Sequence, residues 1–156
     1  MSRAKLVVTV RDASGEPGVP SAAQVRAWVR HALGGGARGE LGVRIVTIEE
    51  MADLNWRYRH KRGPTNVLAF PSEMAPLAAG QPAPIGDLVI AAAVVEREAG
   101  EQGKSSEAHW AHIVIHGTLH LAGYDHVTER DAHVMEDRER ALLAQLGFPD
   151  PYLVRV

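Results

Sequence analysis

The sequence predicts a single-domain α+β protein in which a four-stranded mixed β-sheet packs against about five α-helices. Four short runs of apolar and β-branched residues have the length of strands, and segments with a helical spacing of apolar residues separate or follow most of them. Strands joined through a helix pair in parallel by right-handed crossovers, whereas the third and fourth runs have no helix between them and should reverse direction. A chain of 156 residues has the usual size of one domain, so one domain is predicted over residues 1–156.

The first predicted strand is followed by a helix with a clear start signal. A strand at residues 6–10 and a loop at 12–20 precede Ser21 and Gln24, which have the spacing of a capping box. The next residues place apolar side chains at helical spacing, and three glycines at 34–36 end the helix. The apolar residues of this helix are Val25, Trp28, Val29 and Leu33.

A second strand and helix repeat this arrangement, and two further strands follow. The second strand is predicted at residues 41–48, and Thr47 with Glu50 forms a capping box for a helix through Leu54 and Tyr58. Strands three and four are predicted at residues 67–70 and 85–90. A loop rich in proline, alanine and glycine separates them at residues 71–84.

The rest of the chain, from about residue 91, has a helical pattern. A cap is expected at Ser105 or Ser106, a helix stop at Gly123, and a last helix at residues 128–146. The helix that ends at Gly123 contains four of the eight histidines, and it is the expected zincin-like metal-site helix.

Composition limits the classes of function that the chain can serve. The sequence has no cysteine, so a disulfide framework and thiolate metal ligands are excluded, and a metal would be held by His, Asp or Glu. Neither an export signal nor a membrane span is recognisable, and a cytoplasmic location is expected. A net charge of -2 means that contact with nucleic acid would depend on a local basic patch.

Three histidines have the spacing of a metal site. His116 and His120 stand four residues apart on one helix face, ~6 Å along the axis, so both rings can reach one ion. Gly123 can adopt a left-handed conformation that ends the helix, and the chain then turns back to bring His126 to the same point. Three neutral imidazoles leave a coordination position open for water, whose pKa a bound ion lowers toward ~7. The pattern therefore indicates a catalytic metal site.

Two neighbouring histidines have less certain roles. His112 lies roughly 12 Å from His120 along the helix axis, so these two cannot share one ion. His112 and His109 are interpreted as residues behind the ligands, residues that face substrate, or packed residues. The alternative for the whole group is a set of hydrogen-bonded core histidines or a closed structural metal site.

The same histidine spacing occurs in metzincin proteases, HExxHxxGxxH, but Gly117 occupies the position of their catalytic Glu. A protease of that class needs the carboxylate to move a proton from water to the leaving amine. The glycine therefore argues against peptide hydrolysis.

Several segments resemble the YbeY family of bacterial rRNA-maturation endoribonucleases. Residues 116–126 match its HGxLHLxGYDH motif, residues 54–71 are similar to LNxxYRxKxxPTNVLSFP, and residues 86–90 are similar to its GDIVI strand. Residues 107–112 and 150–152 also match. The resemblance extends over most of the chain from Leu41 to Tyr152, and it departs from the family pattern at Ala69, where the family usually has Ser, and in the loop before the fourth strand.

The resemblance implies a metal-dependent, single-strand-specific endoribonuclease that acts in 16S rRNA 3′-end maturation and ribosome quality control. It also implies the small ribosomal subunit, a small-subunit ribosomal protein and a ribosome-assembly GTPase as partners, and no membrane. The nucleophile is either a metal-bound water or the RNA 2′-hydroxyl. Two alternatives are a metalloprotease-like hydrolase with a substitute base and a non-catalytic ribosome-assembly factor with a structural metal.

A basic segment supplies the candidate substrate contacts. Arg59, to which the resemblance points as the catalytic residue, can hold a phosphate with its planar guanidinium. Lys61 and Arg62 are candidate phosphate contacts, or solvated residues that complement a helix dipole. Thr65 and Asn66 either orient substrate or form the turn before the third strand.

Two carboxylates and the metal identity complete the expectations. Asp87 could orient a ligand histidine or act as an acid or base, and Asp125 could do the same or only cap the turn before His126. Three imidazoles suit zinc, nickel or copper; one divalent ion, Zn²⁺ first and Ni²⁺ second, is expected.

Overall fold

The computed structural model describes residues 5–73 and 83–153. The predicted loop at 71–84 lies mostly outside these residues. The elements, in chain order, are β1 (Leu6–Asp12), α1 (Ala22–Leu33), β2 (Gly39–Val46), α2 (Ile48–Arg59), β3 (Val67–Pro71), β4 (Pro84–Ala91), α3 (Ala92–Glu101), α4 (Ser106–Leu121) and α5 (Glu129–Gln145).

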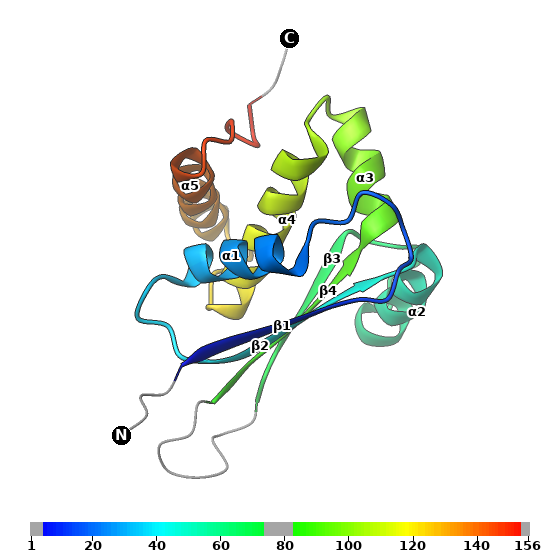
Figure 1. Ribbon diagram of the computed structural model, residues 1–156, viewed down its shortest axis with the longest axis horizontal. Helices are drawn as coiled ribbons and strands as arrows, with labels where there is room; N and C mark the ends of the chain where they lie inside the picture. Colours follow the sequence, from blue (N-terminus) through cyan, green and yellow to red (C-terminus); the bar gives the residue numbers. More distant parts are fainter. Residues whose placement is uncertain (1–4, 74–82, 154–156) are drawn as a thin grey trace.

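The four strands form one mixed sheet, as the sequence predicts (Figure 1). Their order is β1-β2-β4-β3, with β1 and β4 each parallel to β2. β3 is antiparallel to β4 and lies at the sheet edge, so the reversal expected between the third and fourth strands is confirmed. The edge position of β3 matters for function, because it leaves one side of the strand open next to α4.

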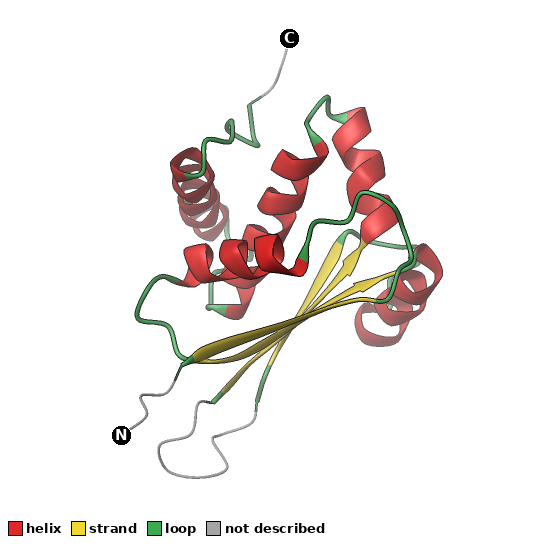
Figure 2. Cartoon of the chain, viewed as in Figure 1, coloured by secondary structure: helices red, strands yellow, loops and turns green. Residues whose placement is uncertain are grey.

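The helices divide between the two faces of the sheet (Figure 2). The larger core joins α1, α4 and α5 to one face, and Leu88 and Ile90 of β4 belong to it. A smaller core joins α2 to the other face and includes Val89 of β4. Alternate residues of a strand point to opposite faces, so this division fixes the side-chain directions on β4 from Asp87 to Ala91.

The helix starts follow the capping signals, with one change at the second strand. Ser21 and Gln24 form the predicted reciprocal capping box. Thr47 caps α2 by accepting a hydrogen bond from the Glu50 backbone N–H at 3.2 Å. The second strand therefore ends at Val46, and the prediction that it continues to residue 48 is wrong because Ile48 already belongs to the helix.

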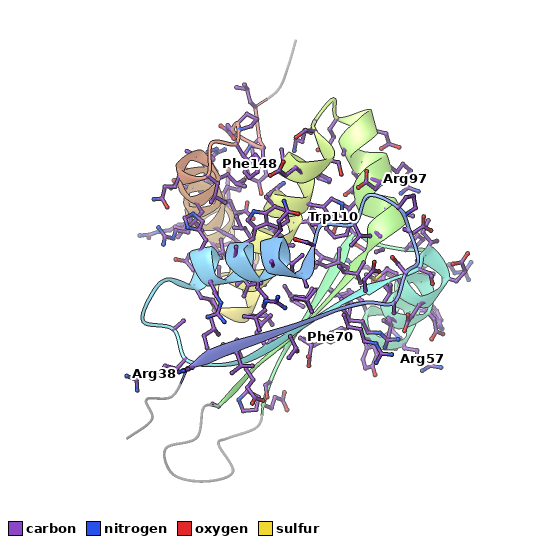
Figure 3. All side chains as sticks on the ribbon, in the orientation of Figure 1. Arg38, Arg57, Phe70, Arg97, Trp110 and Phe148 are labelled. Atoms are coloured by element: carbon purple, nitrogen blue, oxygen red, sulfur yellow. The ribbon has the colours of Figure 1, made fainter. Side chains whose placement is uncertain are left out.

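Helix α4 passes through the middle of the molecule and is almost entirely buried. Trp110 is fully buried in the interior of the fold (Figure 3), and its indole N–H donates to Glu96 at 2.8 Å. Gly117 allows the helix to approach the sheet, because a β-carbon there would lie 2.8 Å from a methyl group of Leu88 and 3.2 Å from Val67. No helix within the described residues is long and apolar enough to span a membrane.

Candidate metal centre

The three predicted ligand histidines meet at one point. His116 and His120 lie one turn apart near the end of α4, and His126 follows in the loop before α5. One ring nitrogen of each lies within 4.8 Å of those of the other two. The ring centroids are 4.6 to 4.9 Å apart. Because all three can turn a nitrogen toward a shared point, the residues fit a single ion.

The turn after α4 brings His126 back to the helix. Ala122 is the cap residue, and Gly123 follows with φ of +105°, a conformation that favours glycine. The Tyr124 N–H donates to the Leu119 carbonyl at 3.0 Å, which closes the turn. Asp125 accepts a hydrogen bond from the His126 backbone N–H at 2.6 Å, so the capping interpretation of Asp125 describes its observed contact.

The protonation state of His120 suits metal binding. Burial, followed by the neighbouring His116 and His126, lowers the pKa of His120 to about 4. A histidine with that pKa is neutral at pH 7 and offers a lone pair, which is the form that binds a metal ion. The weaker influences on the same pKa include the charge of Arg59, which places that guanidinium close to the histidines.

The sequence interpretation missed one residue, Glu139 of α5. Its side chain is fully buried, and one carboxylate oxygen is hydrogen-bonded to Nδ1 of His116. Since Nδ1 donates to Glu139, the other ring nitrogen of His116 is the one that remains for a metal ion. A carboxylate behind a ligand histidine fixes the tautomer and orientation of the ring and makes it a better ligand.

Glu139 is ionised in this environment. Burial alone would raise its pKa, but the nearby His112, 3.6 Å away, and the hydrogen bond with His116 outweigh burial and lower the pKa to about 2. Glu139, His112 and His116 form a second close group of potential ligands. The direct contact of Glu139 with His116 identifies this group as a hydrogen-bonded network behind the three-histidine centre.

The three histidines open onto a cleft of about 430 Å³ between α4, the edge strand β3 and the segment before β3. Of the predicted substrate residues, Arg59, Thr65 and Asn66 line this cleft, and so does Ala69. Lys61 and Arg62 are exposed and are not among its lining residues. Gly117 forms part of the cleft wall, where even a β-carbon would crowd the methyl groups of Leu88 and Val67.

The side chain of Asn66 is fixed by a hydrogen bond to Glu98 of α3. Its side-chain amide donates to Glu98 of α3 at 3.0 Å, and the same carboxylate oxygen lies 3.0 Å from Nε2 of His109. Burial lowers the pKa of His109, and the hydrogen bond with Glu98, which raises this pKa, offsets only part of the effect. His109 is therefore part of the support of the cleft wall and lies behind Asn66.

Two expected site residues lie elsewhere. His112 is buried, and its Nε2 lies 3.3 Å from the Tyr152 hydroxyl and 3.6 Å from Glu139, so it does not face the cleft as a substrate contact. Asp87 is exposed on the α2 face of the sheet, opposite to its neighbour Leu88, which packs against Gly117. This placement argues against an acid, base or histidine-orienting role for Asp87.

The chain is similar to known proteins over most of its length. The family model described as Endoribonuclease YbeY matches residues 19–147. An Endoribonuclease YbeY from Alcanivorax borkumensis is 51% identical over 150 residues, covering 93% of this chain and 85% of the relative. One from Nitrosococcus oceani is 47% identical over 148 residues, covering 94% of this chain and 97% of the relative.

The fold also has a counterpart of low sequence identity. The solution structure of a protein from Thermotoga maritima superimposes with a TM-score of 0.52 at 22% identity, covering 95% of this chain and all of the other. The family model matches most of the chain, and the relatives from Alcanivorax borkumensis and Nitrosococcus oceani are about half identical to it. This chain therefore belongs to the family of Endoribonuclease YbeY.

Proposed function

We propose that this chain is a metal-dependent endoribonuclease that hydrolyses phosphodiester bonds of single-stranded RNA. The observation that carries the proposal is the three-histidine centre in a cleft that Arg59 also lines. In such a cleft the histidines can bind a metal ion, and the guanidinium of Arg59 beside them can bind the phosphate. The relatives named Endoribonuclease YbeY support RNA as the substrate.

The residues of the chain have separate tasks in this reaction. His116, His120 and His126 would hold one divalent ion, with Zn²⁺ the first expectation and Ni²⁺ the second. When bound, such an ion supplies Lewis acidity that activates water and polarises a phosphoryl oxygen. Glu139 holds the ring of His116, and Arg59 presents a planar guanidinium that can bind two phosphate oxygens and offset the charge of the transition state.

Exposed aromatic side chains support a preference for single strands. Trp56 is 52% exposed and Tyr58 is 63% exposed, and both lie in the last turn of α2 next to Arg59. Bases of single-stranded RNA stack on aromatic rings while basic residues bind the backbone, whereas bases in a duplex are already stacked on each other. Lys61 and Arg62, beyond the cleft, would then contact the phosphates that flank the cleaved bond.

We expect replacement of Trp56 by Ala to weaken binding of single-stranded RNA without affecting the chemical step. Stacking on one aromatic residue contributes ~1–3 kcal/mol per base, so KM should rise roughly tenfold. Steady-state cleavage of an unstructured oligoribonucleotide measures this, and the Trp56→Phe variant should recover most of the loss. An unchanged KM in Trp56→Ala would remove Trp56 from the RNA-binding surface.

The biological setting is proposed from the family resemblance. It comprises 16S rRNA 3′-end maturation and ribosome quality control in the cytoplasm. The proposed partners are the small ribosomal subunit, a small-subunit ribosomal protein and a ribosome-assembly GTPase.

The reaction class is tested by offering the purified protein three substrates, each with and without a chelator. Single-stranded RNA should be cleaved without the chelator and remain intact with it. Duplex RNA and casein should remain intact even with added Zn²⁺. Cleavage of casein that the chelator blocks would indicate a protease in spite of Gly117. Metal-loaded protein that leaves all three substrates intact would instead favour an assembly factor with a structural metal.

A further inference from the structure

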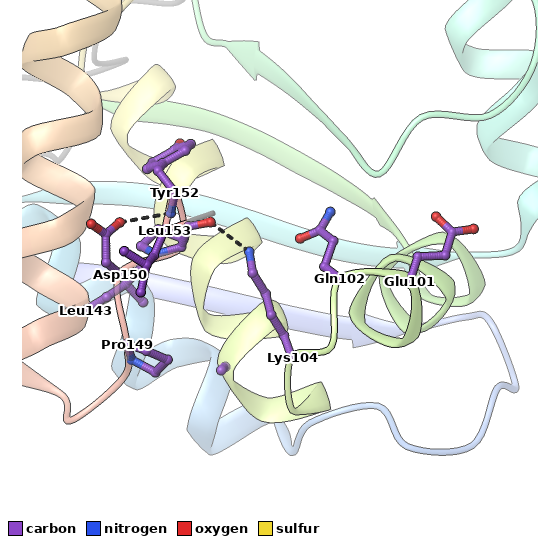
Figure 4. Close-up of a pocket in the computed structure, with 10 residues that line it drawn as sticks. Glu101, Gln102, Lys104, Leu143, Pro149, Asp150, Tyr152 and Leu153 are labelled. Atoms are coloured by element: carbon purple, nitrogen blue, oxygen red, sulfur yellow. Dashed lines mark hydrogen bonds between the residues drawn. The ribbon is translucent and has the colours of Figure 1, made fainter. Parts of the chain in front are cut away.

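The C-terminal turn at residues 150–152 matches the family pattern but has no task in the proposed reaction. Several contacts fasten it to the rest of the fold. Asp150 accepts a hydrogen bond from the Tyr152 N–H at 2.8 Å, and the Lys104 ammonium donates to the Pro151 carbonyl at 3.1 Å (Figure 4). Asp150 also lies 3.2 Å from Nε of Arg140. The Arg140 guanidinium also lies over the Tyr152 ring, 5.2 Å from its centre. The turn is therefore a fixed part of the structure.

The turn places the Tyr152 hydroxyl on the carboxylate behind the metal centre. This hydroxyl donates to the second oxygen of Glu139, while the first oxygen accepts from Nδ1 of His116. Nε2 of His112 lies 3.3 Å from the same hydroxyl and can donate to its oxygen. The hydrogen bonds thus run in one direction from His112 through Tyr152 to Glu139, where they meet the bond from His116.

Glu139 depends on this arrangement because its side chain is fully buried. Among the described residues it is the one fully buried carboxylate, and it lies on the apolar face of α5 between Met135 and Leu142. A buried carboxylate needs hydrogen bonds on both oxygens. Without the Tyr152 hydroxyl, the carboxylate of Glu139 would rotate to bring its second oxygen to His112. This rotation would weaken the hydrogen bond between the first oxygen and the His116 ring.

We propose that Tyr152 is a positioning residue for the metal centre: its hydroxyl fixes Glu139, and Glu139 fixes the His116 ring in the orientation that binds the ion. This inference rests on the proposed function, because it assumes that His116 is a metal ligand. It assigns the C-terminal turn the role of setting the affinity of the centre for its metal. The turn does so from behind the site and without contact with RNA.

The test is Zn²⁺ affinity, measured by competition with a chromophoric chelator for the full-length protein and four variants. Tyr152→Phe removes only the hydroxyl and keeps the ring under Arg140. Glu139→Gln removes the charge that orients His116, and the third variant combines both changes. Leu142→Ala is the control, because it removes buried methyl groups one turn from Glu139 without touching the hydrogen-bonded network.

We expect the Zn²⁺ dissociation constant to rise roughly tenfold in Tyr152→Phe and at least as much in Glu139→Gln, as for other residues that support metal ligands. The double variant should bind Zn²⁺ like Glu139→Gln alone, because Tyr152 acts through Glu139. Leu142→Ala should lower the melting temperature and leave the affinity of the folded protein unchanged.

Three results would overturn the inference. An unchanged affinity in Tyr152→Phe would show that the hydroxyl does not support the centre, and additive effects in the double variant would show that it does not act through Glu139. An equal loss in Leu142→Ala would reduce the effect to general destabilisation. These results leave the proposed function intact, whereas unaltered protein that binds no Zn²⁺ would overturn both. Unaltered protein that binds Zn²⁺ but cleaves no RNA would refute the proposed function alone.

Discussion

Replacing His126 by Ala should abolish most metal binding and, with it, RNA cleavage. If three imidazoles share roughly 10 kcal/mol of binding free energy, the loss of one ligand costs roughly 3 kcal/mol, or at least a hundredfold in the metal dissociation constant. His126 is the best ligand for this test because it is exposed in a loop, so its replacement leaves no cavity. Replacing His116 would also leave one oxygen of the buried Glu139 carboxylate without its hydrogen-bond partner.

Metal content after dialysis and cleavage of single-stranded RNA measure this effect. The matched control is His133→Ala, since the His133 side chain is 68% exposed on α5 and its carboxylate neighbour Glu129 is 3.9 Å away. The control should keep its metal and its activity. Full metal content in His126→Ala would mean that other residues hold the ion.

Local signals explain why the fold could be predicted. The capping residues Ser21 and Thr47 mark the helix starts, and Gly123 marks the turn after α4, because each of these effects acts within a few residues of the chain. The reversal of β3 followed from the missing helix between two strands. The order β1-β2-β4-β3 depends on which faces pack together, and no local pattern contains that information.

The candidate site divides in the same way. His116, His120 and His126 lie within eleven consecutive residues, so helix geometry and one glycine were enough to group them. Glu139 is 23 residues from His116 on another helix, and their contact exists only once α4 and α5 have packed. A signal was nevertheless present, because Glu139 interrupts the buried stripe of α5 that contains Met135 and Leu142.

The period of two along a strand would have corrected the expectation for Asp87. Leu88 belongs to the core beneath α4, so its neighbour Asp87 must point to the other face. His112 shows the same limit on a helix. It lies one turn from His116 and shares its helix face, but the side chains from α5 and the C-terminal turn that cover it come from distant parts of the chain.

Replacing Arg59 by Ala should slow RNA cleavage roughly thirtyfold while metal content and melting temperature stay nearly unchanged. Arg59 is exposed, ends α2 and lines the cleft, so it can reach a phosphate next to the histidines without supporting the fold. A guanidinium that holds the reacting phosphate contributes ~2 kcal/mol or more to the transition state, which corresponds to this change in rate. The cleavage rate of Arg59→Lys should lie between those of the unaltered protein and Arg59→Ala, because an ammonium group attracts the phosphate but cannot form the paired hydrogen bonds of a guanidinium.

The alternative role for Arg59 is to complement the dipole at the end of α2, which would stabilise the fold by a few tenths of a kcal/mol and contribute nothing to cleavage. Single-turnover cleavage at matched metal occupancy separates the two roles. Arg97→Ala is the control, because it removes the same charge from an exposed pair with Glu101 on α3. Arg97→Ala should cleave RNA at the unaltered rate. Because the net charge falls by one in both variants, a loss confined to Arg59→Ala must come from its position in the cleft, whereas equal rates in the Arg59 variants and the unaltered protein would refute the catalytic role.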